Sequence, residues 1–118
     1  MTNIHLISIW PLKDGCTSEL IETLKSMPDQ IIENEPGTLH YEVNIPSENP
    51  LDSDLKTQAE IVFIETYTDA DAFKAHLHGP LFTEFRTKNL AYFHEDPKNP
   101  GWAITNTTFL EVVASADR

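Results

Sequence analysis

Apolar and polar residues alternate along several short stretches of the chain with the two-residue period of β-strands. Residues 3–10 and 59–67 carry apolar side chains on both faces, which is typical of strands buried on both sides. Residues 38–45 alternate strictly and predict a strand with one apolar face. That face consists of Leu39, Tyr41, Val43 and Ile45. Residues 102–113, rich in Thr, Val, Ile and Phe, predict a last strand.

The apolar positions between the first two strands follow the helical period instead. The stripe is formed by Leu20, Leu24, Met27 and Ile31, at spacings of i, i+4, i+7 and i+11. Thr17 or Ser18 can cap this helix at its start, and we expect it to end before the Glu-Pro-Gly sequence at 35–37. Pro28 lies inside the pattern, so we expect a kink there or the start of a second segment.

A second helical region follows the third strand. Asp69, or a capping box over 68–71, can start a helix that carries His76 on or beside the face turned towards the sheet. The Gly-Pro pair at 79–80 breaks this helix, and a further helical segment is expected over 81–91. One side of that segment presents Phe82, Phe85 and Asn89.

The order strand, helix, strand, strand, helix, strand predicts an α+β fold of the ferredoxin-like, split βαβ type. Four antiparallel strands would form one sheet with both helices on the same face. We expect one domain over 1–118, with a core of about 3–113 and a long polar loop at 46–58. Because two strands are apolar on both sides, the uncovered face needs a partner, and a second copy of the sheet is the simplest one. A homodimer is therefore expected.

Charge and composition narrow the range of partners. The chain has 8 Lys and Arg against 19 Asp and Glu, a formal net charge of −11, which disfavours nucleic acid and anionic membranes. The single Cys16 cannot form an internal disulfide. The first ten residues lack the pattern of a secretory signal, and no apolar run approaches the ~20 residues of a membrane span. We therefore expect a cytoplasmic protein.

Several short motifs recur together in one known family. They are Glu35-Pro36-Gly37 before the second strand, Glu65 and Tyr67 at the end of the third, Asp69 as the cap, and Ala72 with His76 and Phe82. In this combination the chain resembles the antibiotic biosynthesis monooxygenase (ABM) family of dimeric α/β barrels, over residues 1–113. The resemblance implies a range of activities: cofactor-independent oxygenation of quinols and anthrones, haem degradation, and isomerisation of small metabolites.

No cofactor is expected from the residues present. The haem-degrading branch of the family carries an Asn, a Trp and an axial His at positions that correspond here to Ser8, His76 and Arg86. His76 and His78 point about 200° apart on a helix, so they cannot share a metal ion in the pocket. The chain contains no HExxH or CxxC motif and no glycine-rich phosphate loop, so neither a metal nor a flavin or nicotinamide is predicted.

His76 is the first candidate for a catalytic base, because an imidazole titrates near neutral pH. Its alternative role is that of a packed core histidine with a satisfied ring. Tyr41, Tyr67 and Arg86 are candidates for holding a developing oxyanion. For the tyrosines the alternative is aromatic packing, and for Arg86 it is a surface ion pair with Glu84 or another of the many acids.

The substrate would be small and aromatic, and it would be held by an apolar pocket between the sheet and the helices. Candidate binding residues are Trp10, Phe73, Phe82, Phe85, Asn89 and Trp102. Glu65, if it points into the dimer barrel, is expected to be a satisfied buried carboxylate rather than a catalytic acid.

The favoured function is cofactor-free monooxygenation of a small aromatic, quinol or polyketide-like substrate, with molecular oxygen as the second reactant. Such a reaction needs a base, an apolar pocket and a group that holds the substrate anion. Two alternatives stay open at this point. One is a non-catalytic or stress-related dimer that binds a small molecule, and the other is an isomerase or cyclase on the same scaffold.

Overall fold

The computed structural model describes residues 3–47, 50–51 and 59–118. Its elements, in chain order, are β1 (Ile4–Pro11), α1 (Ser18–Asn34), β2 (Thr38–Asn44), β3 (Glu60–Tyr67), α2 (Ala70–His78), α3 (Pro80–Asn89), the 3-10 turn η1 (Leu90–Tyr92) and β4 (Asn106–Leu110). Most of the loop predicted at 46–58 lies outside the described residues. Within the described part, no helix is both long and apolar enough to cross a membrane.

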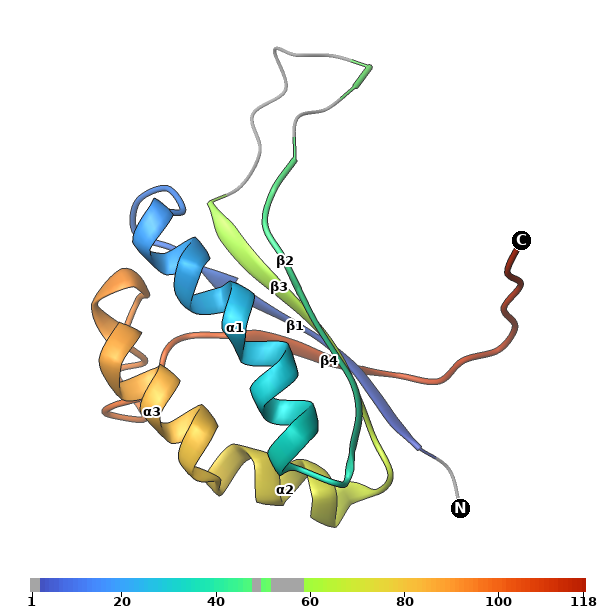
Figure 1. Ribbon diagram of the computed structural model, residues 1–118. Helices are drawn as coiled ribbons and strands as arrows, with labels where there is room; N and C mark the ends of the chain where they lie inside the picture. Colours follow the sequence, from blue (N-terminus) through green and yellow to red (C-terminus); the bar gives the residue numbers. More distant parts are fainter. Residues whose placement is uncertain (1–2, 48–49, 52–58) are drawn as a thin grey trace.

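The four strands form one antiparallel sheet in the order β2-β3-β1-β4, with β1 and β3 in the centre. The three helices lie on one face of this sheet, and no element of the described residues covers the other face (Figure 1). This is the ferredoxin-like arrangement that the sequence predicts.

An aromatic cluster fills the space between the sheet and the helices. The indole of Trp10, at the end of β1, lies at its centre, with four phenylalanine rings at centroid distances of 5.2–6.0 Å. Those rings belong to Phe63, Phe82, Phe85 and Phe93. Edge-to-face packing of this kind adds about 0.5–1.5 kcal/mol per pair beyond simple burial.

The first helix is continuous, so the second segment considered at Pro28 does not form. Thr17 caps the helix, and its hydroxyl accepts a hydrogen bond from the backbone N–H of Leu20 at 3.2 Å. Pro28 removes one backbone hydrogen bond, but the buried residues Met27 and Ile31 on either side of it anchor the helix to the core. Tertiary packing therefore overrides the local preference for a break.

The strict alternation predicted for 38–45 is interrupted by a bulge at Leu39. Thr38 pairs with Tyr67 and His40 pairs with Thr66, so Leu39 is an extra residue without a partner on β3. Leu39 is 51% exposed, while Thr38 is buried. The prediction that Leu39 shares a buried face with Tyr41 is thus wrong, although Tyr41 itself is buried as expected.

The last strand is much shorter than the predicted 102–113. It pairs with β1 only over Asn106–Leu110, and the chain then leaves the sheet and ends away from the body of the molecule (Figure 1). Residues before it are held elsewhere: Ala103 bridges to Glu95, and the N–H of Ile104 donates to His94 O at 2.7 Å. Those bonds fix Trp102 against the helices rather than in the sheet.

Candidate active site

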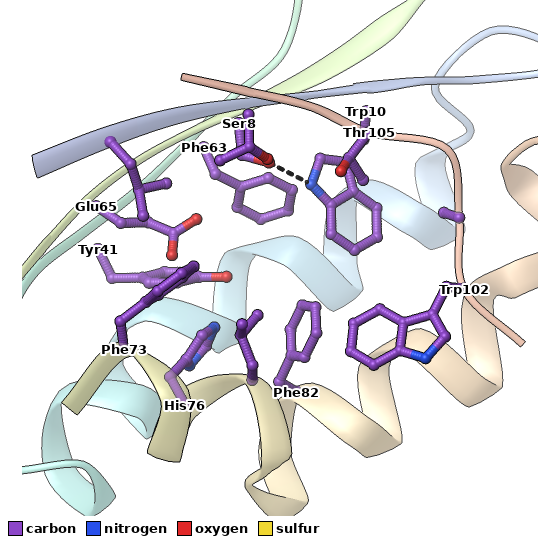
Figure 2. Close-up of a pocket in the computed structure, with 14 residues that line it drawn as sticks. Ser8, Trp10, Tyr41, Phe63, Glu65, Phe73, His76, Phe82, Trp102 and Thr105 are labelled. Carbon is purple, nitrogen blue, oxygen red and sulfur yellow. Dashed lines mark hydrogen bonds between the residues drawn. The ribbon is translucent and has the colours of Figure 1, made fainter. Parts of the chain in front are cut away.

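A small cavity of about 80 Å³ lies between the sheet and the second and third helices. Its walls are mostly aromatic: the rings of Trp10, Phe63, Phe73, Phe82 and Trp102 line it. Figure 2 shows the Tyr41 hydroxyl, the Glu65 carboxyl and the His76 ring around the same space. A mostly apolar cavity with a few convergent polar groups is the usual form of a small-molecule site.

His76 projects into this cavity from α2 and is 2% exposed. Its Nδ1 lies 2.7 Å from Glu35 Oε1. A carboxylate can only accept, so Nδ1 carries the proton and donates it to this bond. In the neutral ring Nε2 is then an unprotonated acceptor, which is the form a general base requires.

Two opposing effects set the protonation of His76. Burial lowers the pKa of the imidazole and is the larger effect, while the charge and hydrogen bond of Glu35 raise it. The net pKa lies below that of an ordinary histidine, so the ring is neutral at pH 7. The rings of Tyr41, Tyr67 and Phe82 surround the imidazole at centroid distances of 5.0–5.6 Å and hold its orientation.

Glu35 reaches His76 because the chain turns sharply after α1. Glu35 is the C-cap of that helix, and its N–H donates to Ile31 O at 2.8 Å. Two residues later Gly37 lies against α2: a Cβ at this position would be 2.5 Å from the Cβ of Ala72. This close approach places the Glu35 carboxylate beside α2, within reach of His76. The Thr38 hydroxyl donates a second hydrogen bond to Glu35 Oε1 at 3.3 Å.

Glu65 faces the cavity from β3, on the side of the sheet that the helices cover. It is 6% exposed, and its Oε1 accepts a 2.5 Å hydrogen bond from the Tyr67 hydroxyl. Burial, together with the negative charge of Glu35, raises the pKa of Glu65 to about 7, although the bond from Tyr67 opposes this rise. Glu65 therefore holds its proton at pH values where an ordinary glutamate is fully ionised.

The two candidate tyrosines have different surroundings. Tyr41 lines the cavity, and burial, with the charges of Glu65 and Glu35, raises its pKa well above the ordinary value. The phenol stays protonated and can donate a hydrogen bond to a ligand oxygen. Tyr67 is fully buried beside the cavity rather than in its lining, and its hydroxyl is committed to Glu65.

Arg86 does not reach the cavity. Its Nη1 donates to Gly101 O at 2.6 Å, and its guanidinium stacks 4.0 Å from the centroid of the Trp102 ring. The ion pair considered with Glu84 is absent as well, because Glu84 pairs with Lys88 at 2.6 Å. Arg86 thus supports a wall of the cavity through Trp102 and cannot hold an oxyanion inside it.

The predicted binding residues fall into two groups. Trp10, Phe73, Phe82 and Trp102 line the cavity that contains His76. Phe85 and Asn89 instead line a separate groove of about 290 Å³ between α1 and α3. The Asn89 side chain donates to Phe85 O at 2.8 Å, so its polarity is satisfied within its own helix.

Sequence reasoning missed the contact between Glu35 and His76. Glu35 lies 41 residues before His76 in the chain, and no local pattern predicts that they meet. Glu65 was considered, but only as a satisfied buried carboxylate; its spacing of two residues from Tyr67 places both side chains on one face of the strand. Ser8 also lines the cavity, and its hydroxyl accepts from the Trp10 indole at 3.0 Å and bonds to Thr107 at 2.8 Å.

No three His, Cys, Asp or Glu side chains of the described ranges gather closely enough to hold a metal ion. The proton-active groups around the cavity are instead carried by separate elements: Glu35 at the end of α1, Tyr41 on β2, Glu65 on β3 and His76 on α2. Such an arrangement can accept a proton from a ligand, donate a hydrogen bond to it and exclude bulk water.

Comparison with solved structures returns the same fold at low sequence identity. A candidate antibiotic biosynthesis monooxygenase from Bacteroides thetaiotaomicron superposes with a TM-score of 0.71 at 17% identity, covering 99% of this chain and 95% of the other. PA3566 from Pseudomonas aeruginosa gives 0.66 at 20% identity, with 97% of each chain covered. Rv0793 from Mycobacterium tuberculosis gives 0.65 at 17% identity, covering 98% of this chain and all of the other (100%).

Sequence comparison agrees with the fold. A search of curated proteins found no significant match. The sequence profile of the family described as antibiotic biosynthesis monooxygenase matches residues 4–88, from the first strand to the end of the third helix. Because that match covers most of the chain, including the Glu35-Pro36-Gly37 turn and His76, the protein belongs to the antibiotic biosynthesis monooxygenase family.

Proposed function

We propose that this protein is a cofactor-independent monooxygenase of small, electron-rich aromatic compounds. The observation that carries the proposal is the contact between Glu35 and His76 at 2.7 Å, which leaves Nε2 of a buried, neutral imidazole available to a ligand in an aromatic cavity. Membership of the family supports the general class of reaction. The substrate class is the one that the family resemblance implies, and the aromatic lining of the cavity supports it.

In the proposed reaction His76 takes the acidic hydrogen of a quinol or anthrone, leaving a substrate anion. The anion gives one electron to O2, and the substrate radical and superoxide combine into a peroxide anion. This anion takes the proton back from His76 and becomes a hydroperoxide. Loss of water then leaves a new carbonyl on the substrate, so that one oxygen atom enters the product and the other leaves as water. The substrate supplies the electrons, and no metal or flavin takes part.

Tyr41 is the group best placed to hold the substrate oxygen. Its raised pKa keeps the phenol protonated, so it donates a hydrogen bond at the moment when His76 creates a negative charge. The aromatic walls formed by Trp10, Phe82 and their neighbours exclude water and pack against the substrate ring. Tyr67 only positions the Glu65 carboxyl through its hydrogen bond, and Arg86 only supports the Trp102 ring of the cavity wall.

The size of the cavity limits the substrate. About 80 Å³ is less than the ~150 Å³ that holds benzene in an engineered protein cavity, so a ring can enter only if lining side chains move. Phe73 and Trp102 are the partly exposed rings of the lining. Because Arg86 stacks on Trp102, Phe73 is the ring that we expect to move when a substrate enters. A single-ring quinol therefore fits more readily than a three-ring anthrone, and the net charge of −11 favours neutral compounds.

The test is oxygen consumption with a panel of quinols and anthrones. His76→Gln should lower kcat/KM by about 10²-fold or more, because a general base contributes 10²–10⁴-fold. Glu35→Gln removes the charge that raises the pKa of His76, so the acid limb of the pH profile should move to lower pH. His78→Gln is the matched control, since His78 is exposed on the same helix.

A different outcome would favour the non-catalytic dimer. If His76→Gln melts several degrees lower than the wild type yet keeps full oxygen uptake, His76 is a packing residue and the base assignment fails. Glu35→Gln would then change stability without moving any kinetic pH limb. Both variants need a melting curve beside every rate, because a buried hydrogen-bonded pair also contributes to the free energy of unfolding.

A further inference from the structure

A pair of hydroxyl side chains borders the cavity away from His76, and the proposed oxygenation does not use it. Ser8 on β1 and Thr107 on β4 are direct partners in the sheet, and both line the cavity. Their hydroxyl oxygens lie 2.8 Å apart, and the Trp10 indole N–H donates to Ser8 Oγ at 3.0 Å. Ser8 is 6% exposed and Thr107 is exposed, so Ser8 lies inside the cavity and Thr107 at its rim.

The hydrogen bonds of this pair leave one hydroxyl proton over. The indole can only donate, so Ser8 Oγ is the acceptor in its bond with Trp10. One hydroxyl proton is used in the bond between Ser8 and Thr107, whichever of the two donates. The other hydroxyl proton meets no acceptor among the described residues. The pair can therefore donate one hydrogen bond to an oxygen atom of a ligand in the cavity.

Five rings place this pair across the cavity from the proposed base. In order around the space they are Trp10, Phe63, Tyr41, His76 and Phe82, and all five line it. Each ring lies 5.0–5.8 Å from the next, centroid to centroid, and the cycle closes from Phe82 back to Trp10. In a cycle of five, each member faces the contact between the two that are not its neighbours. Trp10 therefore faces the contact between Tyr41 and His76, as Figure 2 shows.

The register of the strands gives the same separation. Glu65 pairs with Tyr41 on one side and with Leu6 on the other, so Tyr41 and Leu6 lie two strands apart. Ser8 follows two residues after Leu6 on β1 and shares its face of the sheet. With strands about 4.8 Å apart and a rise of about 3.3 Å per residue, the Cα atoms of Tyr41 and Ser8 are about 12 Å apart. The two hydroxyl side chains thus reach the cavity from separate parts of the sheet.

We propose that Ser8, together with Thr107, forms a second polar subsite, which binds the substrate oxygen that lies opposite the one held by Tyr41. The subsite selects a single ring with two oxygens in the 1,4 arrangement over a ring with one oxygen or with two on adjacent carbons. This inference rests on the proposed function, because that function places the first oxygen beside Tyr41 and His76. It makes Ser8 a specificity-determining residue that takes no part in proton transfer.

The experiment measures equilibrium binding by calorimetry under nitrogen, so that no turnover occurs. The three probes are 1,4-dihydroxybenzene, 1,2-dihydroxybenzene and 4-methylphenol, in which a methyl group of similar size replaces the second hydroxyl. The wild type should bind the 1,4 isomer about 3–10-fold more tightly than 4-methylphenol, which is the scale of one neutral hydrogen bond. The 1,2 isomer should bind no more tightly than 4-methylphenol, because its second hydroxyl cannot reach across the cavity.

Ser8→Ala separates recognition of the second oxygen from a structural role. If Ser8 binds the ligand, this variant should bind the 1,4 isomer and 4-methylphenol with equal Kd values. If Ser8 only accepts the bond from Trp10, the variant should melt at a lower temperature and weaken the two probes equally. Ser18→Ala is the matched control, because Ser18 is exposed at the start of α1. Should Ser8→Ala fail to fold, the three probes on the wild type still decide the question.

Two results would overturn the subsite and leave the oxygenase proposal intact. One is a wild type that consumes oxygen with a quinol yet binds the 1,4 isomer no more tightly than 4-methylphenol. The other is a folded Ser8→Ala variant that keeps the wild-type preference. In contrast, a preference that Ser8→Ala abolishes, in a protein that takes up no oxygen with any quinol, would support the subsite and defeat the oxygenase.

Discussion

At the scale of single residues, His76 and Glu65 in the cavity each bond to a neighbour that lies outside the cavity lining. Glu35 orients His76, and Tyr67 holds Glu65. Neither neighbour lines the cavity itself. Since a hydrogen bond to a charged group is worth about 1.5–3 kcal/mol, each neighbour can shift the protonation of its partner substantially.

Glu65 makes the stability of the fold depend on pH in a definite direction. Its pKa is about 7 in the fold against 4.5 as the ordinary value, so its contribution is fully present below pH 4.5 and is lost as the pH rises to about 7. The shift corresponds to about 3 kcal/mol in the free energy of unfolding, as an order of magnitude. Glu65→Gln should therefore gain stability relative to the wild type between pH 4.5 and pH 8.

Chemical denaturation of both proteins at pH 4.5 and at pH 8 measures this gain in the free energy of unfolding. His76 is present in both proteins, and its lowered pKa costs stability only as the pH falls below the ordinary histidine value, so its effect cancels in the comparison. A Glu65→Gln variant whose stability relative to the wild type does not change with pH would show that Glu65 is ionised as readily in the fold as in the unfolded chain.

At this scale, the sequence could predict the position of a side chain only where neighbouring residues determine it. The helical period placed His76 towards the sheet, because a side chain one turn after Phe73 must share its face. The direction of Arg86 was not predictable, since its partners Gly101 and Trp102 lie in a loop 15 or more residues away. The contact between Glu35 and His76 depends on how the turn after α1 packs against α2, which follows two strands later in the chain. No local residue pattern predicts that packing.

At the scale of elements, the approach of the β2 start to α2 fixes the site. The N–H of Thr68 donates to Gly37 O at 2.9 Å, and the Gly37 backbone lies against the Ala72 side chain. No residue with a Cβ can occupy position 37 without moving α2, because the contact would be 2.5 Å. The glycine of the Glu-Pro-Gly sequence is thus required by packing rather than by its backbone conformation.

Gly37→Ala should therefore destabilise the fold by about 1–3 kcal/mol, the usual cost of overpacking. It should also slow turnover, because α2 carries His76 and any shift lengthens the bond to Glu35. Thermal melting and oxygen uptake measure the two effects. Gly15→Ala is the matched control, because an added Cβ there meets nothing within 4 Å, and the double change Gly37→Ala with Ala72→Gly should restore part of the loss.

If Gly37→Ala is as stable as the wild type, α2 moves easily at this point, and the geometry of the site does not depend on the turn at Gly37.

The order and type of the elements were predictable because their apolar periods are long and regular. The bulge at Leu39 and the early end of β4 were not, because both depend on hydrogen bonds to other strands and loops. Pro28 was tolerated because packing on both sides of it holds the helix.

At the scale of the whole molecule, the sheet has an apolar outer face. Ile7 pairs with Ile64 and Ile9 with Val62, and all four side chains lie on the side opposite the helices. Ile64 is 37% exposed, a large value for a β-branched residue at the centre of a sheet. An apolar face of this kind is usually covered by a partner.

We propose that two copies pack through this face. Light scattering at micromolar concentration should then report twice the chain mass of 13.4 kDa. Ile64→Lys should shift the protein towards monomers, since a charge would be buried in the contact. A wild-type mass equal to one chain would remove the proposal and leave the apolar face without an explanation.

The position of Glu35 and Tyr67 behind the cavity has a consequence for how the protein could be redesigned. The rings that shape the space, such as Phe73 and Trp102, are different residues from those that set the proton chemistry of His76 and Glu65. We expect that replacing a ring alters which molecule fits but leaves the Glu65 and His76 side chains in place. Under the proposed function, substrate choice and reactivity are therefore separable traits, and each can be varied by mutations that leave the other intact.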